Sequence, residues 1–476
     1  MSKTKEKIEI HFVGENAEDV TGSCIWIKTP DTQVILECGL FQCCGKDSIL
    51  KQYKINNRKF EFKPKNLDAI FVMHNHADHC GNVPKCFKEG ANCPLIMPRG
   101  SYEILKILLN DSANIMERDA NTISEQFERD YQPIYGKDDV ENALINYKEY
   151  DFDEIYELNP YIKFRFVSSQ HILNSAQLEL WITCNNITKK ILYTSDLGNL
   201  HVHEYYTHKF KGVSKADVVI GEATYAGTDR IATAKTRKSD LAKIKTVVQE
   251  TTANNGKVLF PCFANQRTQV MVTELYKLFG NDPTFNTTVL IDSPMAANIC
   301  RAIHGSLNKE QQKLWKEVSE WKNLRVVSDH AESKGWREYQ GPLIVCASSG
   351  MLQFGRSVMW TSTLLKNYNN TIMFCGYAAS GSLADIIKNG SKKYVKIDGK
   401  RVYNRAKIVS LTSFSSHMQK DDLKKYYGSI ECDKIILVHG DKDARIAFAP
   451  EVEEERSRNN LTGKVIIANK DYVLRL

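Results

Sequence analysis

The sequence lacks long hydrophobic runs, and this absence excludes several classes of protein. No apolar run approaches the roughly 18 residues that a membrane span requires. The N-terminal segment MSKTKEKIEIHF is charged and has no apolar signal-peptide core. Glycine and proline, at 26 and 12 of 476 residues, are too sparse for a collagen-like or low-complexity chain. We therefore expect a globular protein without a membrane partner, made and kept in the cytoplasm.

The sequence also lacks paired cysteines and a strong excess of either charge. Its 13 cysteines are scattered, and none belongs to a CxxC pair. The adjacent residues Cys43 and Cys44 cannot easily be bridged by a disulfide. This distribution is typical of reduced, mostly buried thiols. A net charge of +7 is mild for this length, so it permits a nucleic-acid substrate without requiring one.

What the sequence does contain is a pattern of short strands and helices that changes character twice. Short strands dominate the first part, including a predicted hairpin from 24–29 and 33–38. After about residue 210, buried strands alternate with amphipathic helices, as in 257–263 followed by 266–280, which indicates a mostly parallel sheet. The last part returns to the first style, with strands predicted over 407–417 and 433–441. The predicted fold class is therefore α/β.

The strongest chemical signal is the segment His-Asn-His-Ala-Asp-His, directly after the predicted strand 67–73. In an extended or tightly turning loop alternate residues project together, so His74 and His76 suit one metal ion. Asp78 and His79 then suit a second ion. Imidazole and carboxylate ligands match zinc or a similar divalent transition metal. The alternative, a solvated turn that happens to be rich in histidine, is disfavoured by four such groups at a strand end.

Further ligand candidates follow other predicted strands. They are His171 in QHILNSA, Asp196 in SDLG and His439 in VHGD. Taken singly, the two histidines also suit buried core positions, and Asp196 also suits a turn. Their company with the His-rich segment favours metal binding.

Together these motifs resemble the metallo-β-lactamase superfamily, and further segments narrow the resemblance to its β-CASP branch of nucleases. Glu222 in GEATYAG is similar to motif A of that branch, His417 in SFSSH to motif B, and His439 to motif C. The segments KVLFPCFANQRTQ, LIDSPMA, CASSGML and FCGYAASGSLA resemble its inserted domain. The resemblance extends from about residue 8 to 440. It is greatest to the family that contains RNA-processing nucleases, including the endonuclease of pre-mRNA 3′-end processing.

This resemblance implies an architecture that agrees with the change in patterning. The metallo-β-lactamase domain would be an αββα sandwich built from residues 1–210 and 396–476. An inserted α/β β-CASP cap would comprise residues 211–395. The active site would lie in the cleft between them.

The resemblance also implies a ligand set and a mechanism. One ion would be held by His74, His76, His171 and Asp196. The second would be held by Asp78, His79, His439 and the same Asp196. The ions would be two divalent cations, Zn²⁺ or, given these ligand types, Mn²⁺. A hydroxide bridging ions about 3.5–4 Å apart would attack the phosphorus of single-stranded RNA.

Asp78, Glu222 and His417 are the expected catalytic residues. His417 would stabilise or protonate the leaving oxygen, and Glu222 would orient His417. The family usually has Asp where this chain has Glu37, which is expected to support a ligand histidine without binding metal.

Candidates for substrate contact are less specific. Arg267, Arg356 and Ser349 lie in the cap segments that resemble the family, and arginine suits phosphate. Phe354, Phe414 and Tyr377 are aromatic residues suited to stacking on bases, although such residues more often belong to a core.

Two other functions remain open from the sequence. In the DNA-acting branch of the superfamily motif C typically carries Val, so His439 favours RNA over a DNA nuclease. An inactive RNA-binding or scaffold subunit would be expected to lose ligands, whereas here all are present. The sequence does not decide between endonuclease and 5′-exonuclease action. It is also compatible with a homo-oligomer and with a place in an RNA-processing complex.

Overall fold

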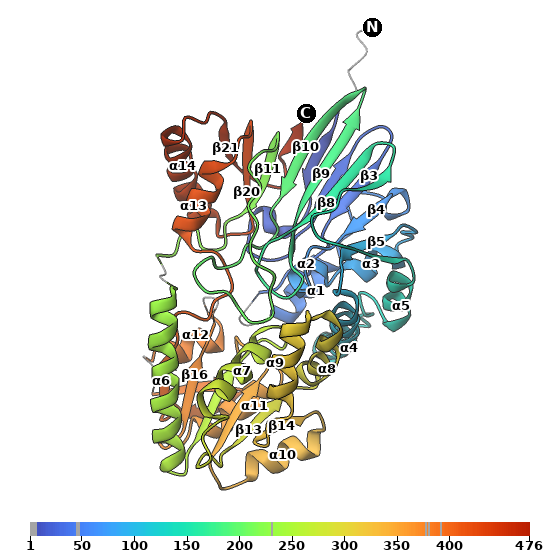
Figure 1. Cartoon of the computed structure of the whole chain (residues 1–476). Coiled ribbons are helices and arrows are strands. Elements are labelled where there is room, and N and C mark those ends of the chain that lie inside the picture. Colours follow the sequence, from blue (N-terminus) through green and yellow to red (C-terminus); the bar gives the residue numbers. More distant parts are fainter. Residues whose placement is uncertain (1–6, 44–47, 230–231, 377, 379–380, 391–392) are drawn as a thin grey trace.

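The computed structural model describes residues 7–43, 48–229, 232–376, 378, 381–390 and 393–476. These residues form two seven-stranded sheets in one half of the molecule and a six-stranded sheet in the other (Figure 1). In this part of the chain, no helix combines the length and the apolar character that crossing a bilayer requires.

The first sheet is built entirely from the two ends of the chain. Ile25 pairs with Leu36 in an antiparallel hairpin, as predicted, and the next three strands add in parallel. The strands, in spatial order, are β22 (Val473–Arg475), β1 (Glu9–Phe12), β2 (Ile25–Lys28), β3 (Gln33–Leu36), β4 (Ala69–Phe71), β5 (Leu95–Pro98) and β6 (Tyr147–Tyr150).

The second sheet packs face to face against the first. It begins as an antiparallel meander and continues with strands that run parallel to one another. Its strands are β21 (Lys464–Ile467), β20 (Lys434–Val438), β11 (Val218–Glu222), β10 (Ile187–Tyr193), β9 (Ala176–Cys184), β8 (Ile162–Ser168) and β7 (Tyr156–Asn159).

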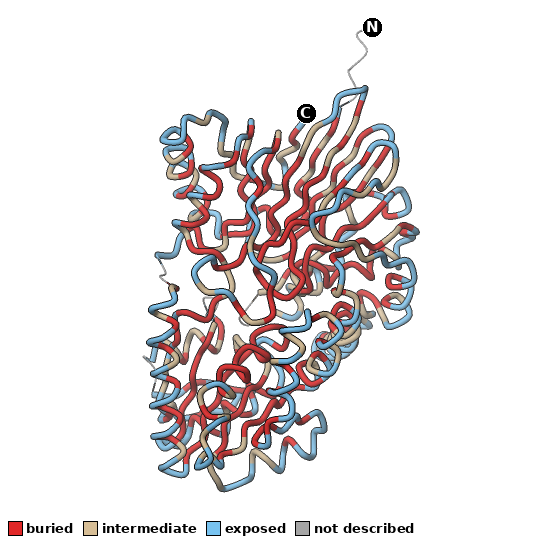
Figure 2. The backbone as a smooth tube through the Cα atoms, viewed as in Figure 1, coloured by how far each residue is buried: buried red, intermediate tan, exposed pale blue. Residues whose placement is uncertain are grey.

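Alternation along each strand divides the side chains between two cores. In β4, Ala69 and Phe71 enter the core between the two sheets, whereas Ile70 points to the helices outside. Figure 2 shows that buried residues run through both sheets. Helices cover the outer face of the first sheet, namely α1 (Ser48–Asn56), α2 (Ala77–Cys80), α3 (Val83–Lys88), α4 (Tyr102–Phe127) and α5 (Lys137–Ile145). The outer face of the second sheet is covered by α13 (Lys420–Ser429) and α14 (Lys442–Arg458). The predicted αββα sandwich is confirmed.

The cap is a parallel sheet with helices on both faces. Its strands, in spatial order, are β14 (Leu324–Val327), β13 (Thr288–Asp292), β15 (Leu343–Ala347), β12 (Lys257–Pro261), β16 (Thr371–Phe374) and β19 (Lys407–Ser410). Its helices are α6 (Ala234–Ala253), α7 (Arg267–Phe279), α8 (Pro294–Ala302), α9 (Lys309–Ser319), α10 (His330–Glu338), α11 (Arg356–Leu364) and α12 (Leu383–Lys388). A separate hairpin is formed by β17 (Tyr394–Ile397) and β18 (Lys400–Tyr403).

Two strands join a different sheet from the one that the sequence indicated. The predicted cap, residues 211–395, includes residues 216–222, but β11 lies between β10 and β20 in the sandwich. Residues 407–410 were assigned to the sandwich, but β19 pairs with β16 at the edge of the cap sheet. Because a strand of four or five residues has the same pattern in either sheet, its sequence does not specify its neighbours. Sheet membership therefore favours two boundaries between sandwich and cap that lie some residues later in the chain than 210 and 395.

The strand predicted over 407–417 also ends early, at Ser410. Beyond it, Asp240 of α6 accepts hydrogen bonds from the backbone N–H groups of Thr412 and Ser413, at 2.7 and 2.9 Å. These bonds replace strand pairing and turn the chain back toward the sandwich.

Candidate metal centre and active site

The chemically active side chains follow the carboxyl ends of strands that share one edge of the sandwich. Strands β10, β11 and β20 are parallel neighbours, so the residues at or just beyond their carboxyl ends emerge on the same side. These residues are Asp196, Glu222 and His439. Strand β8 runs in the same direction because two antiparallel pairings separate it from β10, which places His171 at this edge as well. The topology therefore assembles one site from distant segments.

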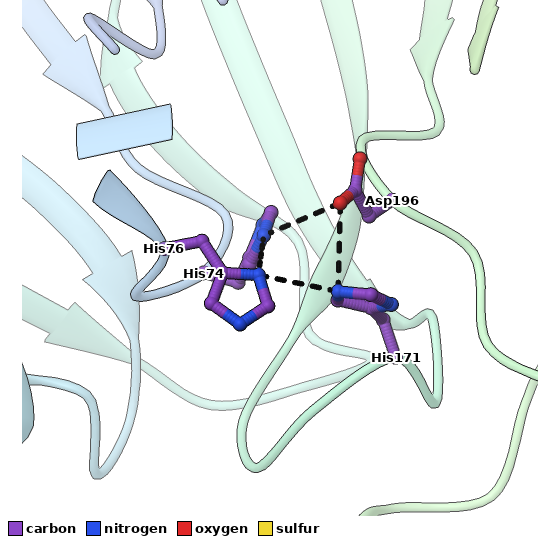
Figure 3. A group of neighbouring side chains, drawn as sticks. All are labelled: His74, His76, His171 and Asp196. Atoms are coloured by element: carbon purple, nitrogen blue, oxygen red, sulfur yellow. Dashed lines mark hydrogen bonds and ion pairs between the residues drawn. The ribbon is translucent and has the colours of Figure 1, made fainter. Parts of the chain in front are cut away.

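The first group of ligand candidates comprises the side chains drawn in Figure 3: His74, His76, His171 and Asp196. His74 Nε2 lies 3.2 Å from His76 Nδ1, and His171 Nε2 lies 3.3 Å from the same nitrogen. Asp196 Oδ2 lies 3.6 Å from His74 Nε2 and 3.4 Å from His171 Nε2. Three nitrogens and one oxygen thus converge on a single point.

The second group comprises Asp78, His79 and His439. Its two histidine Nε2 atoms are 3.1 Å apart, and Asp78 Oδ2 lies 3.8 Å from His79 Nε2 and 3.5 Å from His439 Nε2. The other oxygen of Asp196, Oδ1, lies 3.3 Å from His79 Nε2. Asp196 therefore presents one oxygen to each group.

These donor sets fit divalent metal ions. Four ligands at the Zn–N distance of 2.0–2.1 Å in a tetrahedron would lie about 3.3 Å from one another, close to the separations in both groups. Asp196 Oδ1 is buried without a hydrogen-bond donor in good geometry. A buried carboxylate oxygen facing imidazole nitrogens in this way needs a cation to compensate it.

Glu37 fixes the orientation of the histidines from the side away from the converging nitrogens. Its carboxylate contacts His79 Nδ1 and accepts hydrogen bonds from Tyr193 Oη at 2.6 Å and Ser195 Oγ at 3.0 Å. Ser195 Oγ in turn lies 3.2 Å from His74 Nδ1. Because the Nδ1 atoms of both rings face this network, their Nε2 lone pairs are directed into the two ligand groups.

Burial and charge set the protonation of the two groups differently. Burial lowers the pKa of His74 well below its usual range and that of His76 to about 4, so both are neutral at pH 7. Burial would raise the pKa of Asp78, but His79 and His439 outweigh it and lower that pKa to about 2. Burial would lower the pKa of His79, but the carboxylates of Asp196 and Glu37 hold it well above its usual range. Neutral imidazole and ionised carboxylate are the forms that bind metal, so His74, His76 and Asp78 are already in these forms, whereas an ion bound at the second group would displace a proton from His79.

His417 and Glu222 form a pair beside the first group. His417 Nδ1 lies 3.6 Å from Glu222 Oε1, and the His417 ring centroid is 4.4 Å from that of His171. Glu222 is buried and held in place by the backbone N–H groups of Leu197 at 3.2 Å and Thr224 at 2.7 Å. The His417 side chain remains 20% exposed, so it is available to a substrate.

Helix α6 of the cap holds the segment that leads to His417. Besides the two backbone bonds already described, Asp240 accepts a hydrogen bond from Ser413 Oγ at 2.8 Å. The Arg237 guanidinium lies 3.8 Å from the centroid of the Phe414 ring, which is fully buried. Phe414 therefore packs inside the protein and does not offer a surface for a base.

The predicted arginine contacts have partners within the protein. Arg267 Nη1 donates to Glu204 Oε1 at 3.2 Å, and Arg356 contacts Asp292 and donates to the Val327 carbonyl at 3.2 Å. Each guanidinium group is therefore paired with a buried carboxylate, which disfavours it as a phosphate ligand.

The remaining substrate candidates lie in different settings. Ser349 is buried, and its hydroxyl accepts a hydrogen bond from the Gln353 N–H at 3.1 Å. Phe354 is 46% exposed, which suits contact with a base. Tyr377 lies outside the described residues.

Three residues of the site escaped prediction from the sequence. Tyr193 and Ser195 hold Glu37, and Thr224 Oγ1 lies 2.9 Å from His439 Nδ1. Ser195 and Thr224 lie one and two positions from the predicted residues Asp196 and Glu222, and Tyr193 lies three positions before Asp196. This proximity is the only signal that the sequence offers for them. Small hydroxyl residues are common in turns, so this proximity alone did not distinguish them.

Comparison with known proteins agrees with this geometry. Residues 268–387 match the model of the Beta-Casp domain, and residues 402–462 match that of the Zn-dependent metallo-hydrolase RNA specificity domain. Ribonuclease TTHA0252 of Thermus thermophilus is 28% identical over 439 residues, covering 91% of this chain and 93% of that protein.

Other relatives also align over most of the chain. Transcription termination factor FttA of Methanocaldococcus jannaschii is 28% identical over 94% of this chain and 69% of its own. Integrator complex subunit 11 of Danio rerio is 23% identical over 92% and 70%. A crystal structure of a protein of unknown function from Enterococcus faecalis shares the fold, with a TM-score of 0.54 at 13% identity over 99% of this chain and 100% of that one. The chain therefore carries a Beta-Casp domain and a Zn-dependent metallo-hydrolase RNA specificity domain, and these matches together with its relatives support a metal-dependent nuclease.

Proposed function

We propose that this protein is a ribonuclease that hydrolyses phosphodiester bonds in single-stranded RNA with the help of two divalent metal ions. The observation that carries the proposal is the pair of ligand groups sharing Asp196, with His417 and Glu222 beside them. RNA is favoured as substrate because residues 402–462 match an RNA specificity domain and a relative is named a ribonuclease.

The two ligand groups assign a role to each metal-binding residue. His74, His76, His171 and Asp196 would hold one ion, and Asp78, His79, His439 and Asp196 the other. Zinc suits these nitrogen and carboxylate ligands, and manganese is the alternative. When bound, such ions lower the pKa of a water molecule, making it a nucleophile at neutral pH, and neutralise charge on the phosphate oxygens.

The other residues orient groups and move a proton. Glu37 and Ser195 keep the Nε2 atoms of His74 and His79 directed at the ions. His417 would give a proton to the leaving oxygen of the RNA, a role that suits a partly exposed imidazole next to a ligand group. Glu222, whose Oε1 lies 3.6 Å from His417 Nδ1, would orient the imidazole, and its own two backbone hydrogen bonds keep it from rotating away.

A cleavage assay with labelled nucleic acids tests this function. Single-stranded RNA labelled at its 5′ or 3′ end, and DNA of the same sequence, are incubated with the protein and Zn²⁺ or Mn²⁺. We expect RNA to be cleaved by the wild type and not by Asp196→Asn. The matched control is Asp217→Asn, at the opposite end of β11, where the carboxylate pairs with Lys189 at 2.9 Å. That variant should cleave RNA like the wild type.

The assay also separates the alternatives. Preferential cleavage of DNA would identify a DNA nuclease, and absence of cleavage by a metal-loaded protein would identify a binding or scaffold subunit. The lengths of the 5′- and 3′-labelled products distinguish internal cleavage from stepwise removal of nucleotides from the 5′ end.

A further inference from the structure

The hairpin of β17 and β18 concentrates positive charge on the surface of the cap. Residues 393–405 carry five cationic side chains and one carboxylate, a net charge of +4, whereas the whole chain has +7. All five cations are exposed, and among the described residues none lies within ion-pair distance of a carboxylate. They are Lys393, Lys396, Lys400, Arg401 and Arg405.

The strand register sorts the hairpin into an apolar face and a polar face. Val395 and Ile397 of β17 and Val402 of β18 are buried in the core of the cap. On the outward face Tyr394 is the direct partner of Tyr403, and Lys396 is the direct partner of Arg401. A pair of aromatic rings therefore lies next to a pair of cations, about 7 Å further along the strands.

The two tyrosines are exposed and held in place by cations. Tyr394 is 41% exposed and Tyr403 is 49% exposed. The Arg401 guanidinium lies 4.7 Å from the centroid of the Tyr394 ring, and that of Arg405 lies 5.0 Å from the Tyr403 ring. Such cation–π contacts restrict the rings while leaving surface free for another planar group.

This arrangement matches the repeating chemistry of a single-stranded nucleic acid. Bases stack on exposed aromatic side chains, and the phosphates between them pair with lysine and arginine. A hollow of about 290 Å³ lies beside the hairpin, and its walls are mostly apolar with one lysine. It is lined by Leu383, Ile386, Tyr394, Val395 and Lys396. A membrane surface is a poorer match, because the outward face presents no aliphatic side chains for insertion.

We propose that the outward face of the β17–β18 hairpin is a second RNA-binding surface, outside the metal site, that holds single-stranded RNA through its phosphates and bases. The proposal rests on the proposed function for the choice of RNA as ligand. It predicts that RNA long enough to reach both the metal site and the hairpin binds more tightly than RNA that fills the metal site alone.

Binding and cleavage measured with two RNA lengths test the proposal. Affinity is measured in an Asp78→Asn background, which prevents cleavage, with single-stranded RNAs of about 8 and about 30 nucleotides. The charge variant is Lys396→Gln with Arg401→Gln, and its control is Lys63→Gln with Lys65→Gln. The control lysines are exposed and lie before β4, at the end of that strand opposite the ligand loop.

We expect the charge variant to weaken binding of the long RNA only, and to reduce the slope of log affinity against log salt by about 1.4, since each phosphate contact to a single strand contributes about 0.7. Tyr394→Ser with Tyr403→Ser should weaken binding of the long RNA about 5-fold or more, and Tyr394→Trp with Tyr403→Trp should restore it. The same hairpin variants are also made in the active protein, which keeps Asp78. There, KM for the long RNA should rise, while kcat on the short RNA stays unchanged.

Several outcomes would overturn the proposal. Unchanged binding of the long RNA, or equal weakening by the control pair, would show that the hairpin does not bind RNA. Hairpin-dependent binding to anionic lipid vesicles or to a polyglutamate peptide, without binding to RNA, would identify a different partner. If the wild type cleaves RNA while the hairpin variants bind like it, the surface proposal fails and the function stands. If the wild type cleaves no RNA but the hairpin variants lose RNA binding, the proposed ribonuclease function fails and the surface proposal stands.

Discussion

Replacing Glu37 by glutamine should loosen the second metal site while leaving the fold intact. The carboxylate receives three donors, His79 Nδ1, Tyr193 Oη and Ser195 Oγ, on two oxygens. Glutamine has one acceptor oxygen and directs an NH₂ group at one of the two sides, so at least one buried donor loses its acceptor. Such a loss costs about 1–3 kcal/mol.

That free energy should appear mainly in metal affinity. Glu37 contacts His79 Nδ1 directly, whereas its Oε1 lies 3.7 Å from His74 Nδ1 and is linked to that ring by hydrogen bonds through Ser195. The ion held by Asp78, His79 and His439 should therefore be affected more. Loss of a partner outside the ligand set typically weakens metal binding about 10- to 100-fold, which corresponds to about 1.4–2.8 kcal/mol and agrees with the hydrogen-bond estimate. Competition with a chromophoric chelator for Zn²⁺ measures both sites in turn.

Glu179 on β9 provides a matched control. Its side chain is also fully buried and charged, but it pairs with Arg165 and with Lys190 at 2.5 Å instead of a ligand histidine. Glu179→Gln should lower the thermal midpoint of the metal-free protein and leave both zinc affinities unchanged. The reasoning is refuted if Glu37→Gln binds two ions as tightly as the wild type, or if both variants lose metal in proportion to their loss of stability.

Three further predictions concern the site and the acid stability of the sandwich. Asp78→Ala should abolish RNA cleavage and reduce bound metal with little change in thermal midpoint, because Asp78 lies at the start of the short helix α2 with its side chain partly exposed and outside the hydrophobic cores. An active variant, or one that melts like a core-cavity variant, would exclude it as a ligand. His417→Ala should keep both ions, by elemental analysis, yet cut cleavage about 10²- to 10⁴-fold, whereas His439→Ala should lose or loosen one ion; the opposite pattern would reverse these roles. The hydrogen bond from Lys28 outweighs partial burial and lowers the pKa of Glu9 from 4.5 to about 2. Because this pKa is depressed in the folded state, the stabilisation by Glu9 is present above pH 4.5 and is lost as the pH falls toward 2. Glu9→Gln should therefore be less stable than wild type at pH 7 and show a smaller loss between pH 4.5 and 2 in urea unfolding; equal pH profiles would contradict this.

The sequence by itself was sufficient for the fold class and for the candidate ligands, since both depend on local pattern. The hairpin of β2 and β3 follows from alternating apolar residues on either side of a turn. The His-rich segment after β4 carries its chemistry within six residues, so its spacing alone indicated a metal site. Asp196 is a ligand candidate because it follows a predicted strand in the company of the His-rich segment and agrees with the family resemblance.

Only the tertiary structure decided which strands are neighbours and which polar groups meet. Strands β11 and β19 each join a different sheet from the one predicted, because pairing depends on long-range geometry that a strand of four or five residues does not encode. The same holds for Ser195, which acts only because folding places it between His74 and Glu37. Arg356 shows the reverse case: its sequence context suits phosphate, but the fold pairs it with the buried carboxylate of Asp292. A side chain's chemistry is local, whereas its partner is set by the packing of segments far apart in the chain.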